Sequence, residues 1–357
     1  MRDDAGVSES AKNFVETARI ENFGCVRDVS LELMRLHALI GPNDSGKSTV
    51  LAALRTAGEL IRLGGQELFQ GDLLDPRGAI GTTITMAWDT AASATEIRLI
   101  GTQSRHWRVE AAGPKITGSF QTDLHAPLHG AFATPARGAR LVRWDPDAIR
   151  SPCDLIPESG SLTVDEKGQG IPAIYEAILS RDRRTFDEIE AGLRRHFPTV
   201  KSIWLPTLPG SKKALGVTLN DGTKVHAREM SEGLLYWLAF AVLPHIDPAA
   251  ILLIEEPENG LHPSRIAEVM KVLRAISSRM QVILATHSPL VINELQPEEV
   301  TILTRSPKTG TRATRLDRTK HFQQRQNVYA PGELWLSFAD GDYETALVPD
   351  ETSESAG

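Results

Sequence analysis

The stretch GPNDSGKST at residues 41–49 determines the fold expected of this chain. It follows an apolar run from Leu36 to Ile40 and precedes a helical pattern from Ser48 to Leu63. The spacing fits G-x-x-x-x-G-K-[ST], and a strand before it with a helix behind it is the context in which this motif forms a phosphate-binding loop. The alternative is a glycine-rich turn that matches by chance, and the context argues against it.

The nine residues of this loop are expected to surround the phosphates of ATP, because backbone N–H groups at a helix N-terminus attract anions. Lys47 is placed to reach the β- and γ-phosphates, and the Ser48 hydroxyl to bind Mg²⁺. The sequence therefore predicts ATP and Mg²⁺ as ligands and ATP hydrolysis as the reaction. The predicted ATP-binding residues are Gly41, Pro42, Asn43, Asp44, Ser45, Gly46, Lys47, Ser48 and Thr49.

A second motif is an apolar strand, Ile251 to Ile254, that ends in the two carboxylates Glu255 and Glu256. In a parallel sheet, the carboxyl end of such a strand lies at the ligand-binding edge. Glu255 is expected to help hold Mg²⁺, directly or through its water shell, and Glu256 to orient or deprotonate the attacking water. Alone, the pair is equally compatible with a solvated turn, but the phosphate loop favours the catalytic interpretation.

Two shorter motifs flank this strand. MSEG at residues 230–233 opens an apolar helix with Ser231 as its N-cap, 24 residues before Glu255. His287, in ATHSP, directly follows a second buried strand, 31 residues after Glu256, where it could contact the γ-phosphate. The alternatives are a plain N-cap and a structural histidine, and the order and spacing of the motifs argue against both.

The motifs GPNDSGKST, MSEG, LLIEEPENGLHP and ATHSP, in this order, resemble the ATP-binding-cassette (ABC) class of ATPases. More narrowly, the chain is similar to the SMC/RecF-like and OLD-type AAA family ATPases of bacteria, and its opening ARIENFGCVRDVSLEL resembles theirs. The matching motifs cover residues 18–63 and 228–305. The resemblance implies an α/β P-loop NTPase fold of the ABC/SMC head type, a mixed sheet with an antiparallel β subdomain and a helical insertion.

The resemblance also implies that two ATPase heads form a head-to-tail pair. Each ATP is then held by the phosphate loop of one subunit and the signature serine of the other. The signature residues acting in trans would be Ser231, Glu232 and Gly233, although MSEG is a short form of the family signature. The D-loop that crosses between the two sites would be Glu258, Asn259 and Gly260. The catalytic residues would be Glu256, Lys47 and His287.

The metal site implied by the resemblance contains Ser48, Glu255 and a glutamine that senses Mg²⁺. The first acid after the strand is usually aspartate in this family, so the longer Glu255 puts direct metal contact in doubt. The glutamine should follow the first helix, where Gln66 and Gln70 are both candidates and Gln70 is preferred.

Five segments are predicted along the chain. They are a polar lead-in (1–17), the N-terminal part of the ATPase core with the phosphate loop (18–79), an inserted β-rich and helical subdomain (80–227), the C-terminal part of the core (228–305), and a basic hairpin with an acidic tail (306–357).

Several local structures are also predicted. Residues 80–115 alternate like antiparallel strands, and residues 170–197 look helical. We expect a turn at Arg27-Asp28 between the first two strands. A second turn, at residues 220–222, is expected to join a strand pair formed by SIWLP and KALGVTL.

Composition and charge argue against a membrane or secreted protein. Apolar residues make up 41% of the chain, charged residues 24%, and the formal net charge of −7 provides no general attraction to nucleic acid. Cys25 and Cys153 are expected to be free thiols in a reducing cytoplasm. The longest apolar run, Leu234 to Leu243, is about half of a membrane span. We therefore expect a cytoplasmic protein that does not contact membranes.

A local basic stretch at residues 305–325 could bind a DNA backbone. The alternative, a solvated hairpin beside an acidic tail, is favoured. The candidate nucleic-acid patch consists of Arg305, Lys308, Arg312, Arg315, Arg318 and Lys320.

The leading functional hypothesis is an ATPase that acts as a nucleotide-driven dimerisation switch. Its homodimer would control a separate effector protein, such as a nuclease or toxin, or a DNA transaction in antiphage defence, DNA repair or genome maintenance. The alternatives are an ATP-stabilised structural scaffold with little turnover and an ATP-gated DNA-binding clamp. A transporter ATPase is disfavoured by the large insertion.

Overall fold

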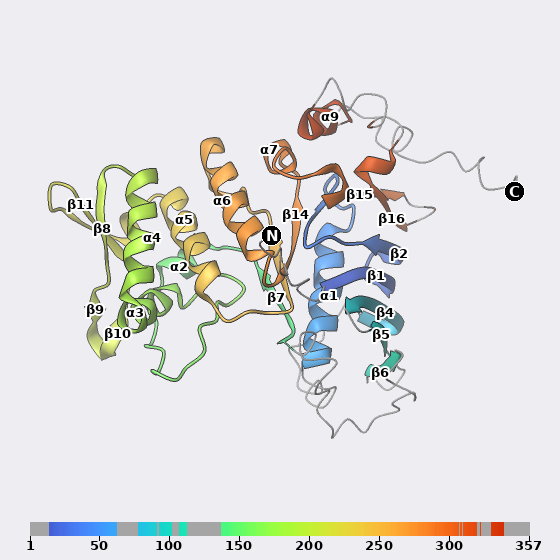
Figure 1. Cartoon of the computed structure of the whole chain (residues 1–357), viewed down its shortest axis with the longest axis horizontal. Coiled ribbons are helices and arrows are strands. Elements are labelled where there is room, and N and C mark those ends of the chain that lie inside the picture. The colour runs from blue at the N-terminus through green and yellow to red at the C-terminus, as the bar shows by residue number, and fades with distance from the viewer. Residues whose placement is uncertain are drawn as a thin grey trace, which may run out of the picture.

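The structure is a computed structural model. It describes residues 14–62, 78–90, 93–101, 107–112, 137–306, 308, 310–319, 322 and 330–338. Two β-sheets enclose one helix, α1 (Lys47–Arg62), and further helices cover the opposite face of the second sheet (Figure 1). No helix in this part of the chain is long and apolar enough to cross a membrane. The residues before 14, Gln66, Gln70, Lys320 and the tail after 338 lie outside the described residues.

The first sheet is antiparallel, with the strand order β2-β1-β4-β5-β6. Its strands are β1 (Phe14–Phe23), β2 (Val26–Glu32), β4 (Gly78–Thr90), β5 (Ser93–Gly101) and β6 (Trp107–Ala112). Along β1, Ala18 and Ile20 are buried, whereas Arg19 lies on the opposite, open face, as strand alternation requires. The antiparallel strands predicted for residues 80–115 are confirmed.

The turn between β1 and β2 lies at Gly24 and Cys25, so the turn predicted at Arg27-Asp28 is wrong. Asp28 is instead part of β2 and pairs across the sheet with Glu21. Its carboxylate accepts two hydrogen bonds from the Arg19 guanidinium, at 3.0 and 2.8 Å. This contact between neighbouring strands offsets the low strand preference of aspartate.

The second sheet has the order β16-β15-β3-β14-β13-β7. Its strands are β3 (Leu36–Ile40), β7 (Ala139–Val142), β13 (Ile251–Glu255), β14 (Gln281–Thr286), β15 (Val300–Ser306) and β16 (Gly310–Arg315). All neighbouring pairs are parallel except β15 with β16. The mixed sheet expected for this fold is therefore confirmed, and the carboxyl ends of β3, β13 and β14 meet at one edge.

The inner strands of this second sheet separate two hydrophobic cores. Along β13, Ile251 and Leu253 face the core that contains α1 and the antiparallel sheet, whereas Leu252 and Ile254 face the core beneath the outer helices. Because successive side chains of a strand point to opposite faces, a continuous apolar run can serve both cores. This two-sided burial keeps the end of β13, and with it Glu255, in a fixed position.

The outer helices are α3 (Ile171–Arg181), α4 (Arg183–His196), α5 (Glu232–Val242) and α6 (Pro263–Ile276). Beside them, β8 (Val200–Trp204), β11 (Gly216–Leu219) and β12 (Lys224–His226) form a small antiparallel sheet. The pairing of β8 with β11 is as predicted. The turn at residues 220–222, however, joins β11 to β12, because the short strand after Gly222 pairs back at once.

Residues 80–227 are distributed over three parts of the fold. Strands β4 to β6 belong to the same sheet as β1 and β2, and β7 belongs to the sheet of the phosphate loop. Helices α3 and α4 pack with α5 in the outer layer. The smaller elements are α2 (Pro146–Arg150), β9 (Thr207–Leu208), β10 (Lys212–Lys213), α7 (Pro289–Ile292) and α9 (Pro331–Phe338).

Candidate nucleotide-binding site

The loop at residues 41–49 connects the end of β3 to the start of α1 and borders a cavity of about 310 Å³. Gly46 has a φ of +104°, and a Cβ atom there would lie 2.8 Å from Thr311 Oγ1. The loop therefore needs glycine at this position both for its conformation and for its close contact with β16. The other walls of the cavity come from the ends of β13 and β14, and from Cys25 and Arg305.

Lys47 folds back over its own loop. Its Nζ atom donates hydrogen bonds to the carbonyl oxygens of Gly41 and Pro42, at 2.7 and 2.9 Å. Burial lowers the pKa of this ammonium, while the nearby carboxylates, Glu256 first among them, act in the opposite direction. From this position the Lys47 ammonium can turn towards an incoming phosphate with a small movement of the side chain.

Ser48 and Glu255 are in direct contact although 207 positions separate them: the Ser48 hydroxyl donates a hydrogen bond to Oε1 of Glu255. A hydroxyl and a carboxylate are the oxygen ligands that Mg²⁺ prefers, and such sites complete their coordination with nucleotide phosphates and water. Among the described residues there is no group of three or more His, Cys, Asp or Glu that could hold a metal alone. The oxygen pair formed by Ser48 and Glu255 fits a metal that completes its coordination with a nucleotide.

The loop also leaves a polar group available for a phosphate. Ser45 Oγ is buried and has no hydrogen-bond partner within the described part of the chain. The first amides of α1 likewise have no acceptor inside the helix, as at any helix N-terminus. These donors and Lys47 together fit a bound triphosphate.

Glu256, the second acid, has a strained backbone with a φ of +49°, which is rare for a residue with a side chain. Its amide is held by Ala285 O at 2.7 Å. Its Oε2 atom accepts a hydrogen bond from Asn259 Nδ2 at 2.5 Å, and its Oε1 atom lies 3.5 Å from His287 Nδ1. The fold thus brings together the predicted base, a D-loop residue and the predicted switch histidine.

Glu258, in the predicted D-loop, connects this loop to the end of β14. Its Oε1 atom accepts a hydrogen bond from Thr286 Oγ1 at 2.6 Å and one from the amide of His287 at 3.4 Å. A displacement of the D-loop would therefore be transmitted directly to the histidine that faces Glu256.

The signature segment lies elsewhere on the surface. Ser231 caps α5, its Oγ atom accepting a hydrogen bond from the Leu234 amide at 3.4 Å, as predicted. Ser231 is nevertheless exposed and does not border the nucleotide cavity. A Cβ atom on Gly233 would lie 3.2 Å from Gly260 O, so the predicted signature and D-loop are neighbours on one surface.

Sequence reasoning missed Arg143. The strand beside β13 is β7, and its pairing of Val142 with Ile254 places the next residue, Arg143, beside Glu255. The Arg143 guanidinium forms an ion pair with Oε2 of Glu255. The only local signal was the short apolar run before Arg143, in a region too rich in Pro, Gly and Ala to assign. The candidates Gln66 and Gln70 lie outside the described residues.

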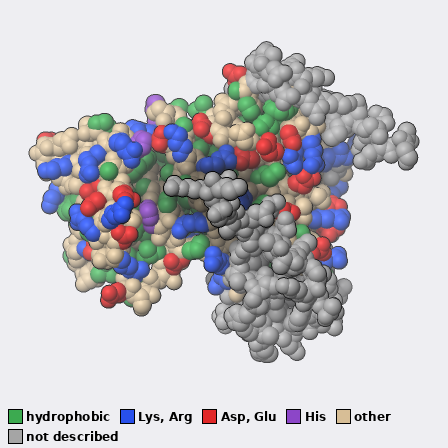
Figure 2. Space-filling view, in the orientation of Figure 1, with side chains coloured by type: hydrophobic (Ala, Val, Ile, Leu, Met, Phe, Trp, Pro, Cys, Tyr) green, Lys and Arg blue, Asp and Glu red, His purple; other side chains and the backbone are tan. Residues whose placement is uncertain are grey.

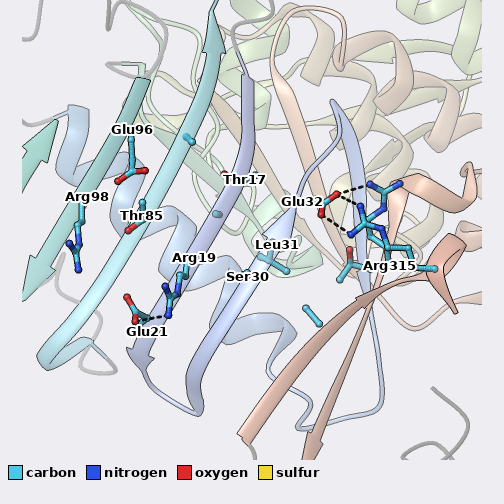
Figure 3. Close-up of a pocket in the computed structure, with 15 residues that line it drawn as sticks. Thr17, Arg19, Glu21, Ser30, Leu31, Glu32, Thr85, Glu96, Arg98 and Arg315 are labelled. Atoms are coloured by element: carbon cyan, nitrogen blue, oxygen red, sulfur yellow. Dashed lines mark hydrogen bonds and ion pairs between the residues drawn. The ribbon is translucent and has the colours of Figure 1, made fainter. Parts of the chain in front are cut away.

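The predicted basic patch is divided in the structure. Arg315 contacts Glu32 at 2.9 Å (Figure 3). Arg315 also contacts Asp317, and Arg318 contacts Glu32, each at 2.6 Å. The hydrogen bond from Arg318 lowers the pKa of the Glu32 carboxyl. Arg305 instead borders the nucleotide cavity, with Nη1 3.5 Å from Asp44 O.

Glu32, Arg315 and Arg318 line a hollow of about 560 Å³ on the open face of the antiparallel sheet (Figure 3). Arg19 with Glu21, and Glu96 with Arg98, occupy the same hollow. Figure 2 shows Lys and Arg side chains interspersed with Asp and Glu side chains over the visible face of the molecule. The paired arginines therefore do not form the continuous basic surface that a nucleic-acid backbone would require.

Two protein-family models match the chain. Residues 14–56 match the model described as "AAA ATPase domain". Residues 158–293 match the model described as "AAA domain, putative AbiEii toxin, Type IV TA system". The first match includes the phosphate loop and the beginning of α1. The second includes the predicted signature, the acid pair and His287.

Solved structures with a similar fold are SMC head domains. One is an SMC head bound to the C-winged helix domain of ScpA, with 14% identity, a TM-score of 0.57, and coverage of 87% of this chain and 99% of that one. A second, bound to the C-terminal domain of ScpA derived from Pyrococcus furiosus, has 13% identity, 88% and 99% coverage and a TM-score of 0.48. The head domain from Thermotoga maritima has 14% identity and a TM-score of 0.46, and the match covers 85% of this chain and 98% of that one. The first match confirms the predicted SMC head fold.

Proposed function

We propose that this chain, an AAA-family protein with the fold of an ABC-type SMC head, binds and hydrolyses ATP and uses the nucleotide to join two copies of itself. The observation that carries this proposal is the separation of Ser231 from the nucleotide cavity. The phosphate loop and Glu256 form one wall of a site, while the exposed cap of α5 is left facing solvent. A second copy, placed head to tail, would supply that cap to complete the site.

Each residue of the wall has a definite task in this proposal. Lys47 and the loop amides would bind the phosphates, and Ser48 with Glu255 would hold Mg²⁺. The metal, when bound, would supply positive charge to neutralise the charge that develops on the transferred phosphoryl group. Glu256, oriented by Asn259, accepts a proton from the attacking water through its carboxylate. His287, 3.5 Å from Glu256, is placed to report loss of the terminal phosphate.

The cap of α5 suits a phosphate ligand in trans. A helix N-terminus presents free amides and a partial positive charge. Because Gly260 lies beside Gly233, where an added Cβ atom would be 3.2 Å from the Gly260 carbonyl oxygen, binding at the signature would also affect the D-loop of the same chain. The D-loop holds Glu256 through Asn259, so closure of one site would affect the other.

The nucleotide is proposed to act as a switch. Moving a pair of heads from mostly open to mostly closed takes about 5.5 kcal/mol of differential binding. Two shared nucleotides with charge-assisted hydrogen bonds can supply an energy of this size. The closed pair would then control a separate effector protein, and the toxin named in the description of one matching model favours a defence role over genome maintenance.

The test uses the variant Glu256→Gln, which keeps the shape of the site but removes the base. In saturating Mg-ATP, light scattering after size exclusion is expected to show a dimer, which reverts to a monomer when ATP is omitted. Adding Ser231→Arg in the same chain should prevent dimerisation while leaving the ATP affinity of the monomer unchanged. A Glu256→Gln variant that binds ATP and remains strictly monomeric would contradict the switch.

The same variant distinguishes the switch from an ATP-stabilised scaffold. A scaffold predicts tight ATP binding with equal, near-zero hydrolysis by the wild type and Glu256→Gln. The switch predicts measurable phosphate release by the wild type and its loss in the variant. An ATP-gated DNA clamp has less support, because Arg315 and Arg318 are already paired with Glu32.

A further inference from the structure

Arg143 reaches the proposed metal site from the edge of the central sheet. Its backbone is fixed by the β7 to β13 pairing and by a hydrogen bond from its amide to Glu166 O at 2.7 Å. Its side chain is 54% exposed, whereas that of Glu255 is only 13% exposed. The guanidinium therefore contacts a largely buried carboxylate while remaining free to move into solvent.

The two oxygens of Glu255 differ in their contacts. Oε1 accepts the hydrogen bond of Ser48, whereas Oε2 is buried, accepts no hydrogen bond within the described residues and forms an ion pair with the guanidinium of Arg143. Ser48 and Glu255 are the two protein groups proposed to hold Mg²⁺. A divalent cation bound to this carboxylate would stand next to the positive charge of Arg143, and like charges at such a distance repel strongly.

We infer that Arg143 occupies the place of the metal: its guanidinium neutralises Glu255 when no nucleotide is bound and must leave before Mg²⁺ can bind. This inference rests on the proposed nucleotide site and deepens it. Arg143 is a positioning residue, because it acts on the metal through Glu255. A buried carboxylate without a counter-ion is costly, so the arginine also stabilises the empty site.

The experiment measures how much Mg²⁺ is needed for nucleotide binding, not turnover. Binding of a fluorescent ADP analogue to the full chain is followed by anisotropy across a Mg²⁺ titration, for the wild type, Arg143→Ala and Arg143→Lys. Removing the competing charge should lower the half-maximal Mg²⁺ concentration about three- to tenfold in Arg143→Ala. Arg143→Lys keeps the charge and should stay close to the wild type.

Arg62→Ala is the matched control. Arg62 is a similarly exposed arginine, paired with Glu59 at 2.9 Å on the same helix as Ser48, and it does not border the cavity. Its removal should leave the Mg²⁺ requirement unchanged. Thermal unfolding of each variant checks that the fold is intact.

The outcomes separate the inference from the function on which it rests. If the wild type shows no Mg²⁺-dependent nucleotide binding, the proposed function fails. If the wild type binds normally but a folded Arg143→Ala has an unchanged or raised Mg²⁺ requirement, only the inference is overturned. An equal shift in Arg62→Ala would likewise overturn it, because the effect would then reflect net charge alone.

Discussion

Asn259 donates its side-chain amide to the carboxylate of Glu256, with 2.5 Å between Nδ2 and Oε2. The backbone repeats the contact, since the Asn259 amide donates to Glu256 O at 3.0 Å. A residue of the predicted D-loop thereby orients the predicted base of its own chain. This contact links the surface that would meet a second head to the chemistry of the site.

We expect Asn259→Ala to lower kcat for ATP hydrolysis about 10- to 100-fold while nucleotide affinity stays within about twofold, because misplacing a catalytic group by a small distance has this effect. Phosphate release and nucleotide binding are the measurements. Asn220→Ala is the control, since its amide donates to Pro198 O at 2.8 Å in a turn that does not border the cavity. An unchanged kcat in Asn259→Ala would contradict the orienting role.

Arg305 is expected to bind nucleotide and not nucleic acid, because it borders the cavity beside Asp44. Arg305→Ala should weaken ATP binding about three- to tenfold, as expected for one exposed charge-assisted contact. Arg318→Ala, which removes the same charge from a Glu32 ion pair, should leave ATP binding unchanged. If Arg305→Ala weakens DNA binding but not ATP binding, the assignment to the nucleotide site is wrong.

Gly260 is expected to tolerate no side chain. It has a φ of +66°, and a Cβ atom would lie 2.1 Å from the Tyr236 ring. Gly222, with a φ of +88° and nothing within 4 Å, is the matched control for backbone strain alone. Gly222→Ala should cost about 1 kcal/mol of unfolding free energy, and Gly260→Ala about 1–3 kcal/mol more.

Urea unfolding of the two glycine variants measures the difference. Equal losses would mean that the ring of Tyr236 moves aside without cost, and that the contact between α5 and the D-loop is loose. A larger loss in Gly260→Ala would mean that the two segments are packed firmly together.

His37, fully buried in β3, is expected to make stability depend on pH. Burial, assisted by the charge of Arg315, lowers its pKa from 6.5 to about 3. Between pH 3 and 6.5 the unfolded chain binds a proton at His37 that the folded chain does not. The contribution of neutral His37 to stability is therefore complete above pH 6.5. Below pH 6.5 it falls by about 1.4 kcal/mol per pH unit. Urea unfolding from pH 6.5 to 4.5 should therefore show a shallower pH dependence in His37→Gln than in the wild type. Parallel curves would contradict it.

Local sequence patterns were sufficient for the elements that build the site. The glycines and Lys47 of the phosphate loop, the apolar strand before Glu255, and the cap at Ser231 are all encoded in short stretches. Strand periodicity, helix caps and loop glycines act over a few residues, so their physical origin is visible in the sequence. For this reason the phosphate loop, the strand before Glu255 and the helix start at Ser231 can be predicted from the sequence.

What the sequence by itself determined was therefore which elements form and which acids end the strand beside the phosphate loop. Only the tertiary structure decided their neighbours: that β7 lies against β13, that Arg143 meets Glu255, and that Arg315 is neutralised by Glu32 from a strand more than 280 positions away. The order of strands in a sheet depends on how whole faces are buried. An exposed arginine finds its partner only after that packing is complete, and no short stretch of sequence encodes the pairing.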